Sequence, residues 1–419
     1  MNIKTCIISL ALTAGFSSSI LFAAVPVTAE QKKQLQSVVD KYYKTYRDKE
    51  QFTAIAASVL IPTERQLDPE DIHSFVAGNI GFAPLDQSIT TNNLFEIGSI
   101  TKSFVSAILL QLQIEKTLSL TDTVGKWLPE YPQWKNVTLR SLLNMTSGIP
   151  NYSNDPEFLK KLYGNLSHVW SNKELLHYAY PDKPIKMNKE NRYEYSNSNY
   201  ILAALIIEKA TKDTFVNQLN QRILKQKNLV NTYYLAGPDG SKVKKSLGNR
   251  LIHGYFYDKK TSNNVDIISN DLSWAGPAGA MVATTENVVE WVQTLYHGLL
   301  FNPRYREDTL ADLETVVSTK TGQTIPTVSE QDPSGFGLGV AYVYDKESKQ
   351  RFWFYEGSTL GFRVMYLWQP CNGVTTVVAL NSKAGQGEPD SKLGDKIAVA
   401  NLDLYKTLMR LYPDLRCES

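Results

Sequence analysis

A serine and a lysine stand three residues apart at the start of an apolar stretch of the chain. Ser99 and Lys102 directly precede the run 103–110, whose composition is typical of a buried helix. On a helix, residues three apart share one face, so the Lys102 amine can reach the Ser99 hydroxyl. A desolvated lysine can lose its charge and then accept the proton of a serine that attacks an acyl group. Ser99 is therefore a candidate nucleophile, with the amides of the first helical turn available to bind an oxyanion.

The Ser-x-x-Lys pattern alone is a weak signal, because an N-cap serine followed by a surface lysine has the same spacing. A second copy, Ser241 to Lys244, follows the turn-forming residues 237–240. Because turn residues dominate this second copy and no apolar run follows it, we predict a solvated loop there.

A second polar segment, residues 193–200, leads into the apolar run 201–207 and thus into another predicted buried helix. Tyr195 is a candidate to exchange protons with the serine and lysine, and Asn197 to donate its side-chain amide to a substrate carbonyl. An ordinary N-cap cluster beside a packing tyrosine is the structural alternative, since the chain contains 23 tyrosines.

With these two motifs the chain resembles the serine β-lactamase and penicillin-binding protein superfamily, in its class C β-lactamase and D-alanyl-D-alanine carboxypeptidase branch. Ser99 to Lys102 matches the Ser-x-x-Lys motif, and Tyr195 to Asn197 matches Tyr-x-Asn. Further segments in family order are 137–150, 275–285 and 335–340. The resemblance implies that Ser99, Lys102 and Tyr195 are catalytic and that Asn197 binds substrate. It also implies an α+β fold of the β-lactamase/transpeptidase kind, with an antiparallel sheet flanked by helices, an inserted all-helical lobe, and the active site between them.

The third motif of the family, Lys-Thr-Gly or His-x-Gly, corresponds here to residues 355–357, Tyr-Glu-Gly. Gly357 lets the strand backbone approach a substrate, and the resemblance implies that the Ser358 amide joins the Ser99 amide in an oxyanion hole. Tyr355 replaces a cation that helps to hold a substrate carboxylate, and it offers only a neutral hydroxyl. We therefore expect residues 355, 357 and 358 to bind substrate, but recognition of penicillins and peptide C-termini to be weakened.

Three neighbouring patterns have two interpretations each. Arg363 either compensates for the missing cation or faces solvent. The aromatic run 352–355 is either a core strand or a wall of the substrate site. The glycine-rich segment 335–339 superficially matches a nucleotide-binding loop, but β-forming residues follow it, so a strand is predicted.

Composition narrows the function without identifying it. The chain has 419 residues, 42% of them hydrophobic, and a net charge of +2, which allows one large core or two. Interspersed charges imply neither nucleic-acid nor anionic-membrane binding, so we expect a small-molecule or peptide substrate: a cell-wall peptide, a β-lactam or an ester. The five histidines are scattered without metal-ligand spacing, and no metal or cofactor is expected. The oligomeric state is left open.

The first 29 residues are predicted to be a signal peptide, with Lys4 before an apolar run at 7–22. Cleavage after Ala29, or after Ala23 or Ala24, fits small-residue cleavage sites. A membrane anchor is the alternative, although the run is short and interrupted by polar residues. The mature protein is therefore expected to be periplasmic or secreted.

Two cysteines remain after the signal segment, and an exported protein permits them to pair. Cys371 lies in a predicted turn between strands, and a final helix at about 393–411 would bring Cys417 back to it. A disulfide is favoured over two free thiols.

The remaining pattern predicts a discontinuous sheet domain, residues 30–98 and 271–419, and a mainly helical lobe, residues 99–270. A polar helix is expected at 29–49 and a hairpin of strands at 53–61 and 73–80. The expected function is that of an exported serine hydrolase, D-alanyl-D-alanine carboxypeptidase-like or β-lactamase-related. A carboxylesterase of the same fold, or a non-catalytic cell-wall peptide-binding protein or scaffold, is the alternative.

Overall fold

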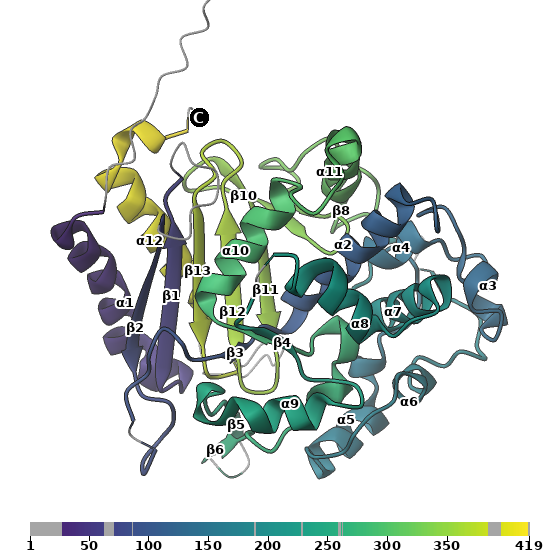
Figure 1. Ribbon diagram of the computed structural model, residues 1–419, viewed down its shortest axis with the longest axis horizontal. Helices are drawn as coiled ribbons and strands as arrows, with labels where there is room; N and C mark the ends of the chain where they lie inside the picture. The colour runs from purple at the N-terminus through teal and green to yellow at the C-terminus, as the bar shows by residue number, and fades with distance from the viewer. Residues whose placement is uncertain are drawn as a thin grey trace, which may run out of the picture.

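An eight-stranded antiparallel sheet runs through the protein (Figure 1), in the order β2-β1-β13-β12-β11-β10-β9-β8. The computed structural model describes residues 27–62, 71–85, 87–187, 190–227, 229–258, 261, 263–383 and 395–417, so most of the predicted signal segment lies outside the described residues. The strands are β1 Ala54–Leu60, β2 Ile72–Gly78, β8 Val317–Ser318, β9 Ser334–Phe336, β10 Ala341–Asp345, β11 Gln350–Ser358, β12 Arg363–Trp368 and β13 Thr375–Leu380. The expected antiparallel sheet is confirmed, and it joins the two ends of the chain.

Helices cover both faces of this sheet. The terminal helices α1 (Ala29–Glu50) and α12 (Ile397–Leu411) pack side by side on one face, and α10 (Thr285–Tyr296) packs on the other (Figure 1). Strand β1 shows why both faces are covered, because its alternate residues enter two different cores. One core, beneath α1 and α12, takes Ile55, Ala57 and Val59. The larger core takes Ala54, Ala56 and Leu60.

The remaining helices gather on the side of the sheet that carries β8 to β11, except α9, which lies below the ends of the strands in this view (Figure 1). They are α2 Thr101–Ile114, α3 Val124–Trp127, α4 Leu139–Leu143, α5 Pro156–Gly164, α6 Asn172–His177, α7 Ser198–Thr211, α8 Phe215–Leu219, α9 Gly240–Leu247 and α11 Arg306–Glu314. Two small sheets accompany them, formed by β3 Phe95–Glu96, β7 Met281–Ala283 and β4 Thr232–Tyr234, and by β5 Tyr255–Asp258 and β6 Asn263–Asp266. The largest hydrophobic core contains residues of these helices together with residues of the large sheet. The division into two domains stays a prediction.

Helix α9 corrects one expectation. The second Ser-x-x-Lys copy lies in this helix and not in a loop. Val243 and Leu247, four residues apart, pack into a small core with Leu251 and Leu272. The apolar face of α9 is short, and the turn residues before it masked it in the sequence.

The two cysteines are paired as favoured. Cys371 and Cys417 form a disulfide with a Cα–Cα distance of 6.1 Å, so the C-terminus is tied to the turn between β12 and β13. The final helix begins at Ile397, and residues 384–394, which include its expected start, lie outside the described residues.

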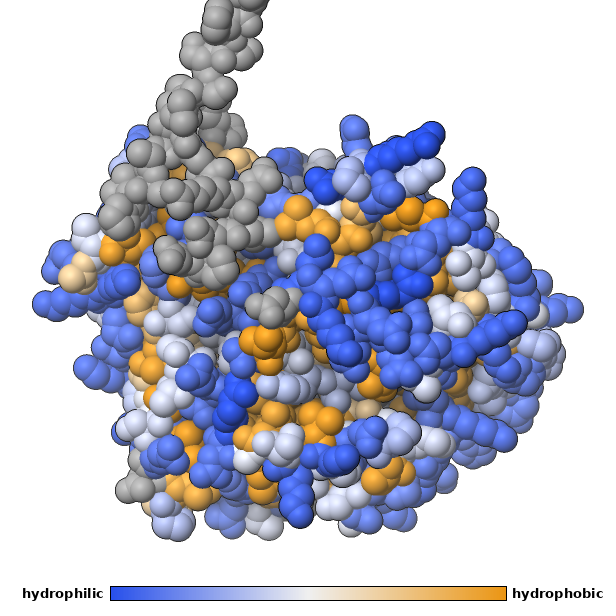
Figure 2. Space-filling view, in the orientation of Figure 1, coloured by the Kyte–Doolittle hydropathy of each residue, from blue (hydrophilic) through white to orange (hydrophobic). Residues whose placement is uncertain are grey.

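Hydrophilic side chains cover much of the face drawn in Figure 2, and hydrophobic ones appear between them in scattered groups. Within the described part of the chain, no helix is both long enough and apolar enough to cross a bilayer.

Candidate active site

The candidate nucleophile lies where a tight turn meets a strand of the large sheet. Ser99 occupies the 3₁₀ turn Gly98–Ile100, directly before α2. A Cβ atom on Gly98 would lie 2.7 Å from the Ser358 amide nitrogen, and one on Gly357 would lie 1.8 Å from the Ile97 carbonyl oxygen. Only glycine fits at both positions, since real Cβ atoms do not approach so closely. The Ser99 and Ser358 backbones therefore lie against each other, as an oxyanion site requires.

The lysine of the motif is completely buried beneath the serine. Lys102 Nζ lies 3.0 Å from Ser99 Oγ and donates to Asn197 Oδ1 at 2.8 Å and to the Ala278 carbonyl at 2.7 Å. Burial lowers the pKa of the Lys102 amine, against the opposing influence of Tyr195. A neutral amine can keep two donated hydrogen bonds and turn its lone pair to the serine, so this environment suits a base.

The second motif faces the first across the cleft. Tyr195 Oη donates to Ser99 Oγ at 2.8 Å, and Lys102 Nζ lies 5.0 Å from the centre of the Tyr195 ring. The predicted convergence of Ser99, Lys102 and Tyr195 is therefore present, over a sequence separation of 96 residues. A hydroxyl in this position can carry a proton between the nucleophile and a leaving group.

Asn197 is held by residues that the sequence analysis did not single out. Its amide Nδ2 donates to Ser153 Oγ at 2.9 Å, and its backbone N donates to Asn151 Oδ1 at 3.0 Å. The Pro150 carbonyl accepts from Ser198 Oγ at 2.6 Å. Residues 150–153, at the end of the segment 137–150 and just beyond it, thus position the second motif, and the Asn and Ser residues of 151–154 were the available signal.

The strand that carries the third motif places its tyrosine next to the hydroxyl of Tyr195. Tyr355, on β11, is 5% exposed, and its Oη lies 3.2 Å from Tyr195 Oη. Burial raises the pKa of Tyr355 well above its ordinary value, so its hydroxyl stays neutral. Along the aromatic run 352–355, Phe352 enters the core beneath α12 while Phe354 and Tyr355 line the cleft, so both interpretations of this run hold in part.

A cleft of about 550 Å³ opens at Ser99 and is mostly neutral. Its apolar and aromatic walls include Phe158, Leu159, Leu162, Trp274, Phe336 and Phe354. Among its described lining residues, Glu356 and Lys383 carry charge, and Lys383 Nζ donates to Tyr163 Oη at 3.3 Å. Of the glycine-rich segment 335–339, Gly335 and Phe336 belong to strand β9 and the remaining three residues lie in the turn after it, so the expected strand is confirmed only in part.

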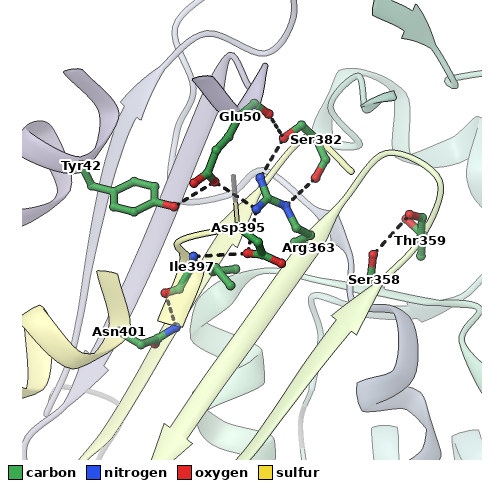
Figure 3. A network of polar contacts seen from close by, with 9 residues as sticks. All are labelled: Tyr42, Glu50, Ser358, Thr359, Arg363, Ser382, Asp395, Ile397 and Asn401. Carbon is green, nitrogen blue, oxygen red and sulfur yellow. Dashed lines mark hydrogen bonds and ion pairs between the residues drawn. The ribbon is translucent and has the colours of Figure 1, made fainter. Parts of the chain in front are cut away.

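Arg363 follows neither of its two expected roles. It is 0% exposed, points away from solvent, and pairs with Glu50 at 3.0 Å and with Asp395 at 2.9 Å (Figure 3). The sequence could not indicate this, because both partners are distant in the chain. Arg363 is therefore a structural residue. It lies on β12 and is paired in register with Ser358 of the neighbouring strand β11.

Glu96 is a buried acid next to the nucleophile turn that the sequence analysis missed. It is 2% exposed, and its Oε2 has no hydrogen-bond partner among the described residues. Burial raises the pKa of Glu96 to about 7, with Thr359 and Lys244 acting in the opposite direction. The protonated acid therefore predominates below pH 7, and the ionised form becomes populated as pH rises above it.

Replacing Glu96 by glutamine is expected to flatten the dependence of stability on pH. A carboxyl whose folded pKa is raised stabilises the fold fully below its unfolded pKa near 4.5 and loses that contribution as pH rises through about 7. The loss for wild type is about 1 to 3 kcal/mol. Urea unfolding of wild type and Glu96→Gln at pH 5 and pH 8 measures this loss. If the free energy of unfolding changes equally between the two pH values in both proteins, Glu96 is not the titrating group.

Comparison with known proteins gives one family and a consistent fold. The model of the Beta-lactamase family matches residues 34–400. Protein flp of Staphylococcus aureus strain N315 is 23% identical over 319 residues, 74% of this chain and 58% of that protein. Penicillin-binding protein 4* of Bacillus subtilis strain 168 is 31% identical over 158 residues, 36% of this chain and 32% of that protein. The chain thus spans less than two thirds of the length of these relatives.

Two solved structures share the fold at low sequence identity. The D-amino acid amidase of Ochrobactrum anthropi SV3, complexed with D-phenylalanine, has a TM-score of 0.73 and 18% identity, covering 91% of this chain and 100% of that one. The D-stereospecific amidohydrolase from Streptomyces sp. has a TM-score of 0.67 and 22% identity, covering 89% and 97%. Identities this low establish similarity of fold alone.

Proposed function

The chain belongs to the beta-lactamase family, and from that premise we propose that it is a serine hydrolase that forms an acyl-enzyme on Ser99. The observation that carries the proposal is the buried amine. Lys102 Nζ lies 3.0 Å from Ser99 Oγ, in surroundings that lower its pKa. A cationic lysine on the protein surface could not accept a proton from serine at neutral pH, but a desolvated one can.

Acylation begins when the neutral Lys102 amine takes the Ser99 proton while Oγ attacks the substrate carbonyl carbon. The carbonyl π electrons move to oxygen, and the amides of Ser99 and Ser358 bind the resulting oxyanion. Asn197, whose side chain contacts Lys102 at 2.8 Å, orients the substrate beside the amine. The new bond joins Oγ to the acyl carbon.

Collapse of this intermediate breaks the bond to the leaving group. Tyr195, at 2.8 Å from Ser99 Oγ, donates its proton to the departing nitrogen or oxygen, and the Lys102 ammonium returns a proton to Tyr195 through the hydrogen-bonded cluster. Water then attacks the acyl-enzyme with the same groups acting as the base. The products are a carboxylic acid and an amine or alcohol.

The bond attacked is proposed to be an amide or an ester, in a reaction of the carboxypeptidase, β-lactamase or esterase kind. The aromatic and neutral cleft suits an apolar acyl group. The names of the relatives support amide substrates, since they include a penicillin-binding protein and a D-amino acid amidase.

The protein is proposed to act outside the cytoplasm. The apolar run 7–22 supports export, and so does the pairing of Cys371 with Cys417, because such disulfides persist in oxidising compartments. Thr28 caps α1, its side chain accepting from Gln31 N at 3.2 Å. Cleavage after Ala23 or Ala24 retains this cap, so we favour those two sites.

Acyl transfer to Ser99 is expected when the protein is briefly incubated with the phenyl ester of phenylacetylglycine and, separately, with benzylpenicillin. Intact mass spectrometry detects the adduct, and peptide mapping locates it. The matched control is Ser241→Ala, which removes the serine of the other Ser-x-x-Lys copy and is expected to leave the adduct unchanged. An adduct located elsewhere would overturn the assignment of Ser99. Neither an adduct nor hydrolysis of either probe would favour a non-catalytic binding protein.

A further inference from the structure

Tyr355 ends a row of three hydroxyls that starts at the nucleophile. Its Oη lies 3.2 Å from Tyr195 Oη, which lies 2.8 Å from Ser99 Oγ. The ring of Phe336 meets both tyrosines edge to face, at centroid distances of 5.9 Å to Tyr355 and 6.3 Å to Tyr195. Edge-to-face packing on Phe336 holds both rings, and Tyr355 is also buried, so the contact between the hydroxyls is built into the site.

We infer that Tyr355 positions Tyr195 for proton transfer, and that it makes the leaving-group side of the cleft selective for amides or esters whose leaving group has no carboxylate. This inference rests on the proposed function of Ser99 and narrows its substrate class. Tyr355 thus takes part in proton transfer. A substrate carboxylate on this side of the cleft would meet a neutral phenol and not a cation.

The first half of the inference follows from the charge that develops on Tyr195. When Tyr195 gives its proton to the leaving group, its oxygen becomes negative. Tyr355 Oη, 3.2 Å away, then donates to that oxygen, and hydrogen bonds to charged oxygens are about twice as strong as neutral ones. Because Tyr355 stays protonated, it remains a donor throughout the cycle.

The second half follows from the charges along the cleft. Among the described residues that line the cleft, Lys383 is the cation and Glu356, next to Tyr355 on β11, is the acid. Lys383 contacts Tyr163 of α5 at 3.3 Å, and Tyr355 instead contacts Tyr195 and Phe336. A neutral phenol attracts a carboxylate less than an ammonium does, so an anionic leaving group gains little at this position.

The test compares two esters that share the phenylacetylglycyl group and differ in the leaving phenol. One carries phenol and the other 3-carboxyphenol. For wild type, kcat/KM is expected to be about tenfold higher for the phenyl ester. In Tyr355→Lys and Tyr355→His, the ratio is expected to shift by about tenfold or more toward the carboxylated ester. Two cationic variants are included so that poor folding of one does not decide the outcome.

Two further variants distinguish the role of Tyr355 in proton transfer from its role in selectivity. Tyr355→Phe is expected to lower kcat by about tenfold for both esters with their ratio unchanged, because it removes the hydroxyl without adding charge. Lys242→Gln, on the exposed face of α9 and outside the lining of the cleft, is the matched charge control and is expected to leave the ratio of the two esters unchanged.

Several outcomes would overturn the inference. These are a wild-type preference for the carboxylated ester, an unchanged ratio in both cationic variants, an unchanged kcat in Tyr355→Phe, or loss of selectivity in Lys242→Gln. Hydrolysis of neither ester would instead defeat the proposed function itself, and the inference with it.

Discussion

Replacing Lys102 by methionine is expected to lower the rate of acylation by about 10⁴-fold, nearly as much as replacing Ser99 by alanine. Groups that act as one catalytic unit lose most of their effect when either is removed. Methionine fills a similar volume, but it has no lone pair basic enough to take the serine proton. The burst of phenol released from the phenyl ester measures acylation directly.

Lys102→Arg is the informative companion, because arginine keeps the positive charge and stays protonated at any working pH. It is expected to be as inactive as the methionine variant, which would separate the role of the lysine as a base from its role as a cation. Lys242→Met, on the exposed face of α9, is the control and retains activity. More than a tenth of wild-type activity in Lys102→Arg would contradict the role of Lys102 as a base.

The wild-type rate should also report the titration of this amine. Because burial lowers the pKa of Lys102, acylation is expected to rise with pH to a plateau reached below the ordinary range of lysine.

Replacing Arg363 by methionine is expected to destabilise the protein by about 3 to 5 kcal/mol, because it leaves a buried carboxylate without its cation. Glu50 is 0% exposed, and its Oε2 accepts from Arg363 at 3.0 Å and from Tyr42 at 3.0 Å (Figure 3). Arg363 also donates to the Ser382 carbonyl at 2.9 Å. The network therefore joins the end of α1 to strand β12 and to the residues that follow β13. Denaturant unfolding measures the loss.

The double variant Arg363→Met with Glu50→Gln tests the cause. Removing the carboxylate charge as well is expected to recover a large part of the lost stability, since the penalty comes from the unpaired charge and not from the missing contact. Burial raises the pKa of Glu50 and Arg363 acts against it. The single variant should therefore be least destabilised at low pH, where the carboxyl is protonated, and more destabilised as pH rises. Additive losses in the double variant would rule out this explanation.

Elements with a clear hydrophobic period were predictable from the chain. The apolar runs after Ser99 and Asn197 became α2 and α7, and the hairpin at 53–61 and 73–80 became β1 and β2 with boundaries shifted by one or two residues. Periodicity suffices in such cases because burying one face favours the same element almost regardless of its neighbours. Helix α9 was missed because its apolar face consists of few residues and depends on a core supplied by distant segments.

The candidate site divides in the same way. Ser99 and Lys102 were predictable as a pair because three residues of helix dictate their proximity, and family order connected them with Tyr195 and Asn197. The contact of Tyr355 with Tyr195, the carbonyl of Ala278 beneath the amine, and the buried acid Glu96 were not predictable. The Tyr355 and Ala278 contacts span 160 and 176 residues, and nothing local in the sequence indicates them.

The sequence by itself therefore determined which side chains could react and which local element presents the first two. Only the tertiary structure decided what surrounds them: that Lys102 is desolvated, that Tyr355 joins the hydroxyl row, and that Arg363 is a buried structural cation. The physical reason is that helical geometry acts over three or four residues, whereas desolvation and ion pairing depend on which distant surfaces pack together.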